Sequence, residues 1–414
     1  MISMNIPLAK PIIDDDEIRA VSRVLKSGWL IQGPEVEAFE REFAEFVGAP
    51  FACAVSSCTT ALHLALLTVG VRPGDEVITV SHSFIATANA IRYCGGVPVF
   101  VDIQPRTFNI DPALVGDAIT ERTRAILCVH QMGMPCDLKA IVEIARARSL
   151  PVVEDAACAI GSEIRWQGSW ETIGRPRGDI ACFSFHPRKL ITTGDGGMIT
   201  TANKDFDRQF RLRRQHGMDV PGSVKYDARQ VLFESYLDIG FNYRMTDIEA
   251  ALGRVQLNRL PKIIESRRDL AARYRLFLGD IPGVELPEEP EWARSNWQSY
   301  CVRLPEGLDQ RKVMQALLDA GIATRRGTMC AHREPAYPRG TWSCGPMSDD
   351  CSCPPGTCSR LRESERAQDV ALTLPLFPQM TDAEQDHVIQ ALREALQTQT
   401  YEAPRSHLRE SLRR

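Results

Sequence analysis

The chain has 414 residues, more than one hydrophobic core usually supports, so a lone binding module is excluded and two domains are expected. Its hydrophobic fraction of 44% and charged fraction of 25% are those of an ordinary globular protein, and no stretch approaches the roughly 18 apolar residues of a membrane span. Forty-nine Lys and Arg residues against 53 Asp and Glu residues leave a net charge of -4, which offers no basic field for a nucleic acid.

The N-terminal segment, MISMNIPLAKPIIDDDE, has neither a basic stretch followed by an apolar core nor a small-residue cleavage site. We therefore expect a cytoplasmic protein without a membrane partner. The 13 cysteines agree with a reducing compartment, since most of those before residue 302 stand in apolar or turn contexts where a reduced thiol acts as a small hydrophobe.

Short apolar runs alternate with helix-period stretches through the first half of the chain, a pattern typical of strand-helix-strand units. The apolar runs predict strands at 51–55, 76–80, 97–101, 125–129, 151–154, 180–185 and 197–201. Helices are expected at 60–69, 85–93 and 138–148. The predicted fold class is α/β, with a large, mostly parallel sheet flanked by helices.

The pattern changes near Met245, where two long amphipathic helices separated by Pro261 are expected. The domain boundary is placed here, with a large domain over 1–255 and a smaller α/β domain over 256–400. The smaller domain is expected to hold a strand at 297–304, helices at 310–320 and 383–396, and a Cys-rich insertion at 337–362. Residues 401–414 form a polar tail.

An acid and a lysine stand at the ends of two predicted strands. Asp155 follows one buried run, and Lys189 follows Ser184 and His186 at the end of another. Pyridoxal phosphate (PLP) requires an amine for its Schiff base and a carboxylate that keeps the pyridine nitrogen protonated. An ordinary ion pair between Asp155 and Lys189 explains the two residues about equally well on this pattern alone.

Residues 54–62 predict a strand, a small-residue turn and a helix start, an arrangement that suits a phosphate group. Plain capping of the helix by Ser57 or Thr59 is the better interpretation of this segment taken singly. Phe84 stands at another strand-helix junction, where its ring could stack on a flat cofactor, although a core role is commoner.

The chain resembles the DegT-type nucleotide-sugar aminotransferases, PLP enzymes of fold type I, over nearly its whole length. The matching stretches are SGWLIQGPEVEAFEREFAEFVGA (27–49), AVSSCTTALHLAL (54–66), PGDEVITVSHSFIATANAI (73–91), VDIQPRTFNIDP (101–112), VVEDAACAIGS (152–162), FSFHPRK (183–189), GDGGMITT (194–201) and GFNYRMTDIEAALGRVQL (240–257). The Cys-rich insertion and the tail lie outside the resemblance.

The resemblance implies roles for individual residues. Lys189 matches the Schiff-base lysine and Asp155 the partner of the pyridine nitrogen. Ser184 matches the hydroxyl that binds the cofactor phosphate, together with the Cys58-Thr59 turn. Two further cofactor contacts are implied at the remaining matched positions, namely ring stacking by Phe84 and a phosphate contact by Asn242 from the other subunit of a homodimer.

The sequence departs from the family pattern at two cysteines. Cys58 stands where the family usually has Gly. A backbone N–H at this position can still donate a hydrogen bond to the cofactor phosphate. Cys158 stands where many members have Gln or His near the ring hydroxyl, so the family's tuning of the cofactor ring does not carry over to this position. Substrate contacts are expected from loops, with Trp29, His186 and His332 as the candidates.

The implied function is transfer of an amino group from glutamate to a keto group of a nucleotide-linked deoxysugar, for an amino sugar of a surface polysaccharide or a secondary metabolite. A deoxysugar dehydratase resembles these enzymes but has His in place of Lys189. Two more functions are compatible with the same fold, namely amination of a keto-cyclitol and non-catalytic regulation.

The late cysteines raise the question of a structural metal. Cys344, Cys351, Cys353 and Cys358 follow Cys330 and His332 in a stretch too poor in apolar residues to bury a core of its own. Their spacing, C-x6-C-x-C-x4-C, lacks the paired C-x2-C knuckles of common zinc sites, so no metal is predicted. Thiols in a mobile loop are expected instead.

Overall fold

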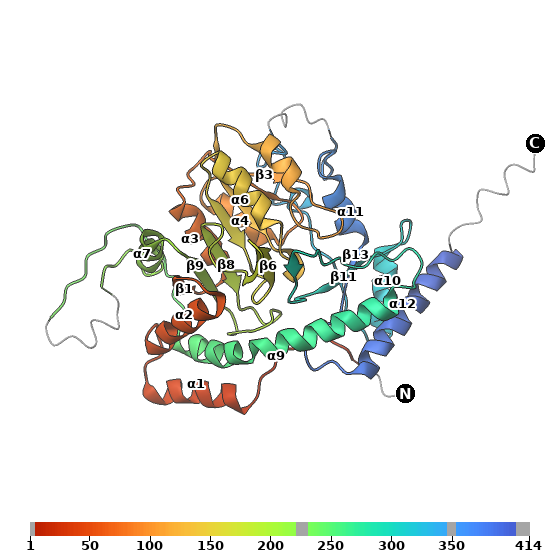
Figure 1. The fold of residues 1–414 in the computed structure, drawn as a ribbon, viewed down its shortest axis with the longest axis horizontal. Coiled ribbons are helices and arrows are strands. Elements are labelled where there is room, and N and C mark those ends of the chain that lie inside the picture. The colour runs from red at the N-terminus through yellow and green to blue at the C-terminus, as the bar shows by residue number, and fades with distance from the viewer. Residues whose placement is uncertain (1–4, 221–230, 346–352, 403–414) are drawn as a thin grey trace, which may run out of the picture.

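The computed structural model describes residues 5–220, 231–345 and 353–402. Its centre is a seven-stranded sheet with the strand order β1-β9-β8-β5-β4-β2-β3 (Figure 1). The strands are β1 (Phe51–Val55), β2 (Glu76–Val80), β3 (Val97–Val101), β4 (Thr123–Val129), β5 (Val152–Asp155), β8 (Ile180–Ser184) and β9 (Gly197–Thr201). The strands from β8 to β3 run parallel, whereas β9 is antiparallel to both β8 and β1. The predicted α/β class is confirmed.

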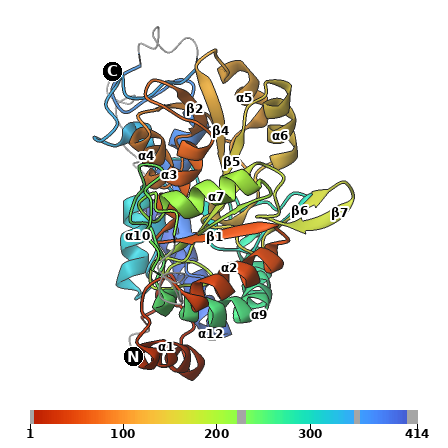
Figure 2. The same ribbon diagram turned by 90° about the vertical axis from the view of Figure 1, so that its left-hand side faces the viewer.

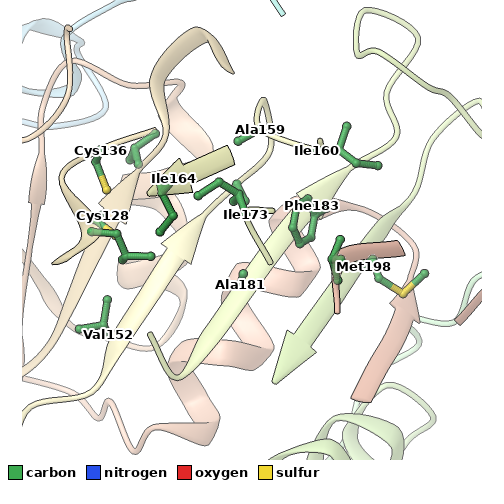
Figure 3. Packing of buried hydrophobic residues seen from close by; sticks show 14 of the residues in the cluster. Cys128, Cys136, Val152, Ala159, Ile160, Ile164, Ile173, Ala181, Phe183 and Met198 are labelled. Carbon is green, nitrogen blue, oxygen red and sulfur yellow. The ribbon is translucent and has the colours of Figure 1, made fainter. Parts of the chain in front are cut away.

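Helices cover both faces of this sheet. One face packs against α3 (Cys58–Thr68), α4 (Ile85–Tyr93) and α7 (Lys204–Arg213). The other face packs against α2 (Pro34–Val47), α6 (Leu138–Ala147) and the first part of α9 (Asp247–Leu278). Figure 3 shows side chains of the core on this second face, among them Val152, Phe183 and Met198. Burial of both faces explains why the strands are apolar throughout.

The helix α9 corrects the expectation of two helices separated by Pro261, because it runs unbroken through this proline. A proline inside a helix costs about 3 kcal/mol. The flanking residues Leu260 and Ile264 bury in the large-domain core, whereas Leu270 and Tyr274 bury in the second core. This burial on both sides of Pro261 outweighs the lost hydrogen bond, and α9 joins the two cores (Figure 1). The division of the chain at residue 255 stays a prediction.

The second core surrounds a three-stranded antiparallel sheet with the order β11-β13-β12. Its elements are β11 (Tyr300–Arg303), α10 (Gln310–Asp319), β12 (Arg325–Arg326), α11 (Arg362–Val370), β13 (Ala371–Leu374) and α12 (Asp382–Glu402). A third sheet, which was not predicted, comprises β10 (Ala293–Arg294), β6 (Glu163–Trp166) and β7 (Ser169–Thr172). Figure 2 shows the β6-β7 hairpin extending away from the central sheet.

The remaining elements are short or lie at the N-terminus. Helix α1 (Asp15–Ser27) begins at a capping box made by Asp14 and Glu17, and it packs on α9. The short helices are α5 (Pro112–Val115), η1 (Gly116–Ala118), η2 (Gln131–Gly133) and η3 (Ala331–Arg333). Within the described part of the chain, no helix combines the length and the hydropathy that crossing a bilayer requires.

The described ends of the Cys-rich insertion pack against the large domain. Ser343 pairs with the edge strand β3, accepting a hydrogen bond from the Phe100 N–H at 2.7 Å. Cys344 and Cys358 are buried beside Phe100 in a small apolar cluster, which corrects the expectation of a loose loop at these two positions. The stretch needs no core of its own because it covers an existing sheet edge. Cys351 lies outside the described residues.

Candidate active site

A cavity of about 690 Å³ lies at the carboxyl ends of β5 and β8. This size is typical of cofactor and ligand sites. Most of the predicted site residues line the cavity, although they come from four separate segments of the chain: Cys58, Thr59, Phe84, Asp155, Cys158, Ser184, His186 and Lys189. The sheet therefore gathers at one edge what the sequence spreads over more than 130 residues, as expected for ligand sites in α/β sheets.

The amine of Lys189 donates a hydrogen bond to the sulfur of Cys158 at 3.0 Å. The lysine follows β8 in a turn closed by a bond from its N–H to the carbonyl of His186. Burial by itself lowers the pKa of the Lys189 amine, but attraction by Cys158, Cys58 and Asp155 outweighs it and raises this pKa. Cys158 thus contacts the amine directly.

Asp155 ends β5, and the residue is only 5% exposed. One carboxylate oxygen accepts a hydrogen bond from the Thr87 hydroxyl at 2.7 Å, and the other accepts one from the Ala157 N–H at 3.2 Å. These bonds hold a negative charge at the cavity wall. The sequence analysis missed Thr87, which lies 68 residues before Asp155 in the chain and belongs to no motif that predicts this contact.

The N-terminus of α3 opens into the same cavity. Ser57 caps the helix by accepting a bond from the Thr60 N–H at 3.2 Å, as the plain capping interpretation required. The backbone N–H groups of Cys58 and Thr59 donate no hydrogen bond within residues 5–220, 231–345 and 353–402. Two backbone donors at a helix N-terminus thus remain for an anion such as a phosphate.

Gly197 permits a close approach at this turn. A Cβ at this position would lie 2.5 Å from the backbone carbonyl group of Ser57 and 2.7 Å from the Cys58 nitrogen, so any larger residue would push β9 away from α3. The hydroxyl of Ser184, at the end of β8, also lines the cavity. Amine, carboxylate, hydroxyl and free N–H groups together fit the chemistry of PLP.

Phe84 and His186 lie at the rim of the cavity. Phe84 is the residue before α4, and 60% of its surface is exposed, so its ring is available for stacking rather than committed to the core. His186 is exposed as well, and partial burial is the main cause that lowers the pKa of its imidazole. Both residues line the cavity, and their contact with a ligand stays a prediction.

Three candidates lie outside the lining of the cavity. Trp29 donates a bond to the Gln32 carbonyl near the start of α2. Asn242 is exposed, and its backbone pairs with Gln215. His332 is buried between the Ser81 hydroxyl at 2.7 Å and Glu365 at 3.0 Å, so the geometry assigns it a packing role instead of the expected substrate contact.

Other lining residues were not among the predicted site residues. Arg188, Gln298, Arg325, Thr328, Met329 and Thr373 all contribute to the cavity wall. All except Arg188 come from beyond residue 256, from a region in which the sequence predicted no cofactor contact. Among the described residues, no group of three or more His, Cys, Asp or Glu side chains could hold a metal ion.

The fold and the cavity define a PLP-dependent aminotransferase of fold type I. The chain matches the model of the DegT/DnrJ/EryC1/StrS aminotransferase family over residues 11–393. It therefore belongs to this family, as the resemblance in its motifs predicted.

Curated relatives and a solved structure agree with this assignment. The chain is 37% identical to the spore coat polysaccharide biosynthesis protein SpsC of Bacillus subtilis, over 94% of this chain and 96% of the relative. It is 38% identical to the GDP-perosamine synthase of Caulobacter vibrioides, over 94% of this chain and 98% of the relative. A Streptococcus pneumoniae protein described as a sugar aminotransferase, solved in its PMP form, aligns with a TM-score of 0.84 at 27% identity, covering 96% of this chain and 99% of that one.

Proposed function

We propose that this aminotransferase moves an amino group from glutamate to a keto group of a nucleotide-linked deoxysugar. The observation that carries the proposal is the Lys189 amine, which shares one cavity with the Asp155 carboxylate and the N–H groups of Cys58 and Thr59. The name of the Caulobacter vibrioides relative supports a sugar nucleotide as acceptor. The product would be an amino sugar for a polysaccharide or a secondary metabolite.

Different residues of the cavity would bind different parts of the cofactor. The N–H groups of Cys58 and Thr59 and the Ser184 hydroxyl would bind its phosphate, and the Asp155 carboxylate would hold a proton on its ring nitrogen. When bound, PLP supplies a carbonyl that links covalently to amines and a ring that accepts electrons.

Lys189 is the general acid and base in this proposal. Its amine nitrogen would take a proton from the substrate carbon and deliver it to the cofactor carbon. This transfer requires a flexible base inside the cavity, where Lys189 lies. The sulfur of Cys158, 3.0 Å away, holds the amine on the cavity side. A dehydratase of the same family pattern has His at this position, so the presence of Lys189 favours amino transfer.

The amino donor is tested by incubating the PLP-loaded enzyme with glutamate alone. Conversion of the cofactor to its amine form, followed by visible absorbance, and release of 2-oxoglutarate are the expected results. No conversion with glutamate, but conversion with another amino acid, would contradict glutamate as donor.

The acceptor is tested by assaying amine transfer to a panel of keto-sugar nucleotides together with a keto-cyclitol. We expect transfer to at least one keto-sugar nucleotide and none to the cyclitol. Reaction with the cyclitol alone would refute the proposed acceptor class while leaving the aminotransferase itself intact.

We further propose that the active enzyme is a homodimer with a shared site. Large apolar side chains are exposed on the segment before Asn242, including Val231 at 82%, Phe233 at 88% and Ile239 at 85%. Exposed apolar side chains grouped in this way are typical of protein interfaces. A partner covering them would bring Asn242 of one subunit near the cofactor phosphate of the other.

Mixed dimers test the shared site. Lys189→Ala and Asn242→Ala homodimers are each expected to be impaired, and mixing them with subunit exchange should restore about a quarter of the wild-type activity, because each mixed dimer then contains one intact site. No restoration despite proven exchange, or an active monomer in sedimentation, would contradict the proposal.

A further inference from the structure

Two arginines line the cavity without an acidic partner. Arg188 precedes Lys189, and Arg325 lies in β12 of the second core, so they approach the cavity from different parts of the fold. Within the described residues, no carboxylate lies within 4.0 Å of either guanidinium. Arg326, the neighbour of Arg325 in the same strand, instead pairs with Glu334 at 3.3 Å and does not line the cavity.

The two side chains lie close enough to repel each other. Arg325 is exposed on one side, and its partial burial against the cavity lowers the pKa of the guanidinium, while repulsion by Arg188 and then by Arg326 lowers it further. Like charges that face one cavity without an acid between them leave a positive potential there. An anion bound between Arg188 and Arg325 would relieve this repulsion.

The backbone holds both arginines in place. The Arg188 carbonyl accepts a bond from the Gln298 side chain at 2.6 Å, and the Arg188 N–H donates to the His186 ring at 3.2 Å. Arg325 is in register with Thr373 of β13, which also lines the cavity. A site of this kind is built on strands and turns and does not depend on a free loop.

We propose that Arg188 and Arg325 form an anion-binding site that receives an oxyanion group of the substrates next to Lys189. This inference rests on the proposed function, under which the donor carries carboxylates and the acceptor a diphosphate. Planar guanidinium groups bind both kinds of oxyanion through paired hydrogen bonds. Because both substrates must reach Lys189, they enter the same cavity in turn and can use the same two arginines.

Binding to the PLP-loaded enzyme tests the site without catalysis. The probes are glutarate, a dicarboxylate that lacks an amino group, and inorganic pyrophosphate, each titrated by calorimetry. We expect at least one probe to bind the wild type and to bind the Arg188→Gln/Arg325→Gln double variant about tenfold or more weakly. Arg326→Gln is the matched control and should bind as the wild type does.

Kinetics separate the two sources of the anion. Arg325→Gln should raise the KM for glutamate if the site receives the donor carboxylate, and the KM for the keto-sugar nucleotide if it receives the diphosphate, with kcat changed much less. A circular dichroism spectrum and a cofactor absorbance that match the wild type show that a variant is folded and loaded. Arg325→Lys, which keeps the charge, should restore part of the affinity.

The proposal is overturned if neither probe binds the wild type, or if the double variant binds both probes as tightly as the Arg326→Gln control does. It is also overturned if Arg325→Gln changes kcat and leaves both KM values untouched. A wild type that binds the probes through these arginines, but aminates no keto-sugar nucleotide, would refute the proposed acceptor and leave the anion site standing.

Discussion

The cavity has two walls that differ in how they are built. On the sheet wall, Asp155, Ser184 and Lys189 are buried or half-buried at strand ends, and Asp155 and Lys189 are held by the side chains of Thr87 and Cys158. On the wall formed by the second core, Arg325 is exposed and has no acidic partner among the described residues. The sheet wall carries the groups that we propose for the reaction, whereas the wall of the second core suits recognition of the variable part of the substrates.

The largest effect is expected on the sheet wall at Lys189. Lys189→Ala removes the amine that we propose transfers the proton and should lower turnover by about 10⁴-fold, because no other lysine among the described residues lines the cavity. Product formation measured by chromatography checks this. A variant that turns over normally and keeps the absorbance of lysine-bound cofactor would contradict the assignment of Lys189.

A second prediction concerns the support beneath this wall, at the buried carboxylate of Glu40. It accepts bonds from the Ala54 N–H at 2.9 Å, from Arg211 at 2.7 Å and from Arg214, so it ties α2 and α7 to β1. Glu40→Gln should cost about 3–5 kcal/mol of unfolding free energy, since it leaves a buried arginine without its partner. Denaturant unfolding measures this loss.

The same carboxylate predicts a pH dependence. Burial alone raises the pKa of Glu40, but attraction by Arg214 and Arg211 outweighs it and lowers this pKa. The contribution of Glu40 to stability is therefore present above its unfolded pKa and is lost as the pH falls through the lower folded pKa. Glu42→Gln on the same helix, whose partner Arg254 is partly exposed, should cost no more than about 1 kcal/mol and serves as the control.

The third prediction concerns the charge at Asp155. Asp155→Asn keeps the shape of the side chain but removes the charge, and should reduce turnover by about 10²–10³-fold. Thr87→Val removes one hydrogen bond to this carboxylate and should reduce turnover by about tenfold. Steady-state kinetics rank the two variants. An equal loss in both would show that Thr87 does more than orient Asp155.

A smaller effect is expected at Cys158. Attraction by this residue helps raise the pKa of the Lys189 amine, so Cys158→Ala should lower that pKa. Uptake of PLP by cofactor-free enzyme requires the neutral amine, and the variant should therefore take it up rapidly at lower pH. Stopped-flow absorbance measures this uptake. Cys94→Ala, outside the cavity, is the control and should follow the wild-type profile.

The smallest effect is expected outside the cavity lining, at the start of the Cys-rich insertion. The Tyr337 hydroxyl donates a bond to the Asn89 side chain at 2.7 Å. Tyr337→Phe should lower the unfolding free energy by about 1 kcal/mol. Because this contact lies outside the cavity, kcat and KM should stay unchanged. A shift in the cofactor absorbance would show that the insertion influences the active site.

Local sequence determined most of the central sheet and the identity of the chemical groups. The apolar runs at 51–55, 76–80, 97–101 and 197–201 are strands with those bounds, because a strand covered on both faces must be apolar along its length. The motifs around Asp155 and Lys189 pointed to one cofactor because they resemble those of a known family. These features depend on neighbours in the chain, so the sequence displays them directly.

Only the tertiary structure decided what depends on contacts between distant residues. Burial in two cores carries α9 through Pro261, although the local pattern predicted a break. The hydrogen bond from Thr87 to Asp155 joins residues 68 positions apart in the chain. The hydrogen bond between Ser81 and His332, which holds His332 outside the cavity lining, joins residues 251 positions apart. The approach of Arg325 to Arg188 likewise exists only once β12 meets the cavity, because the proximity of two charges is a property of the folded chain.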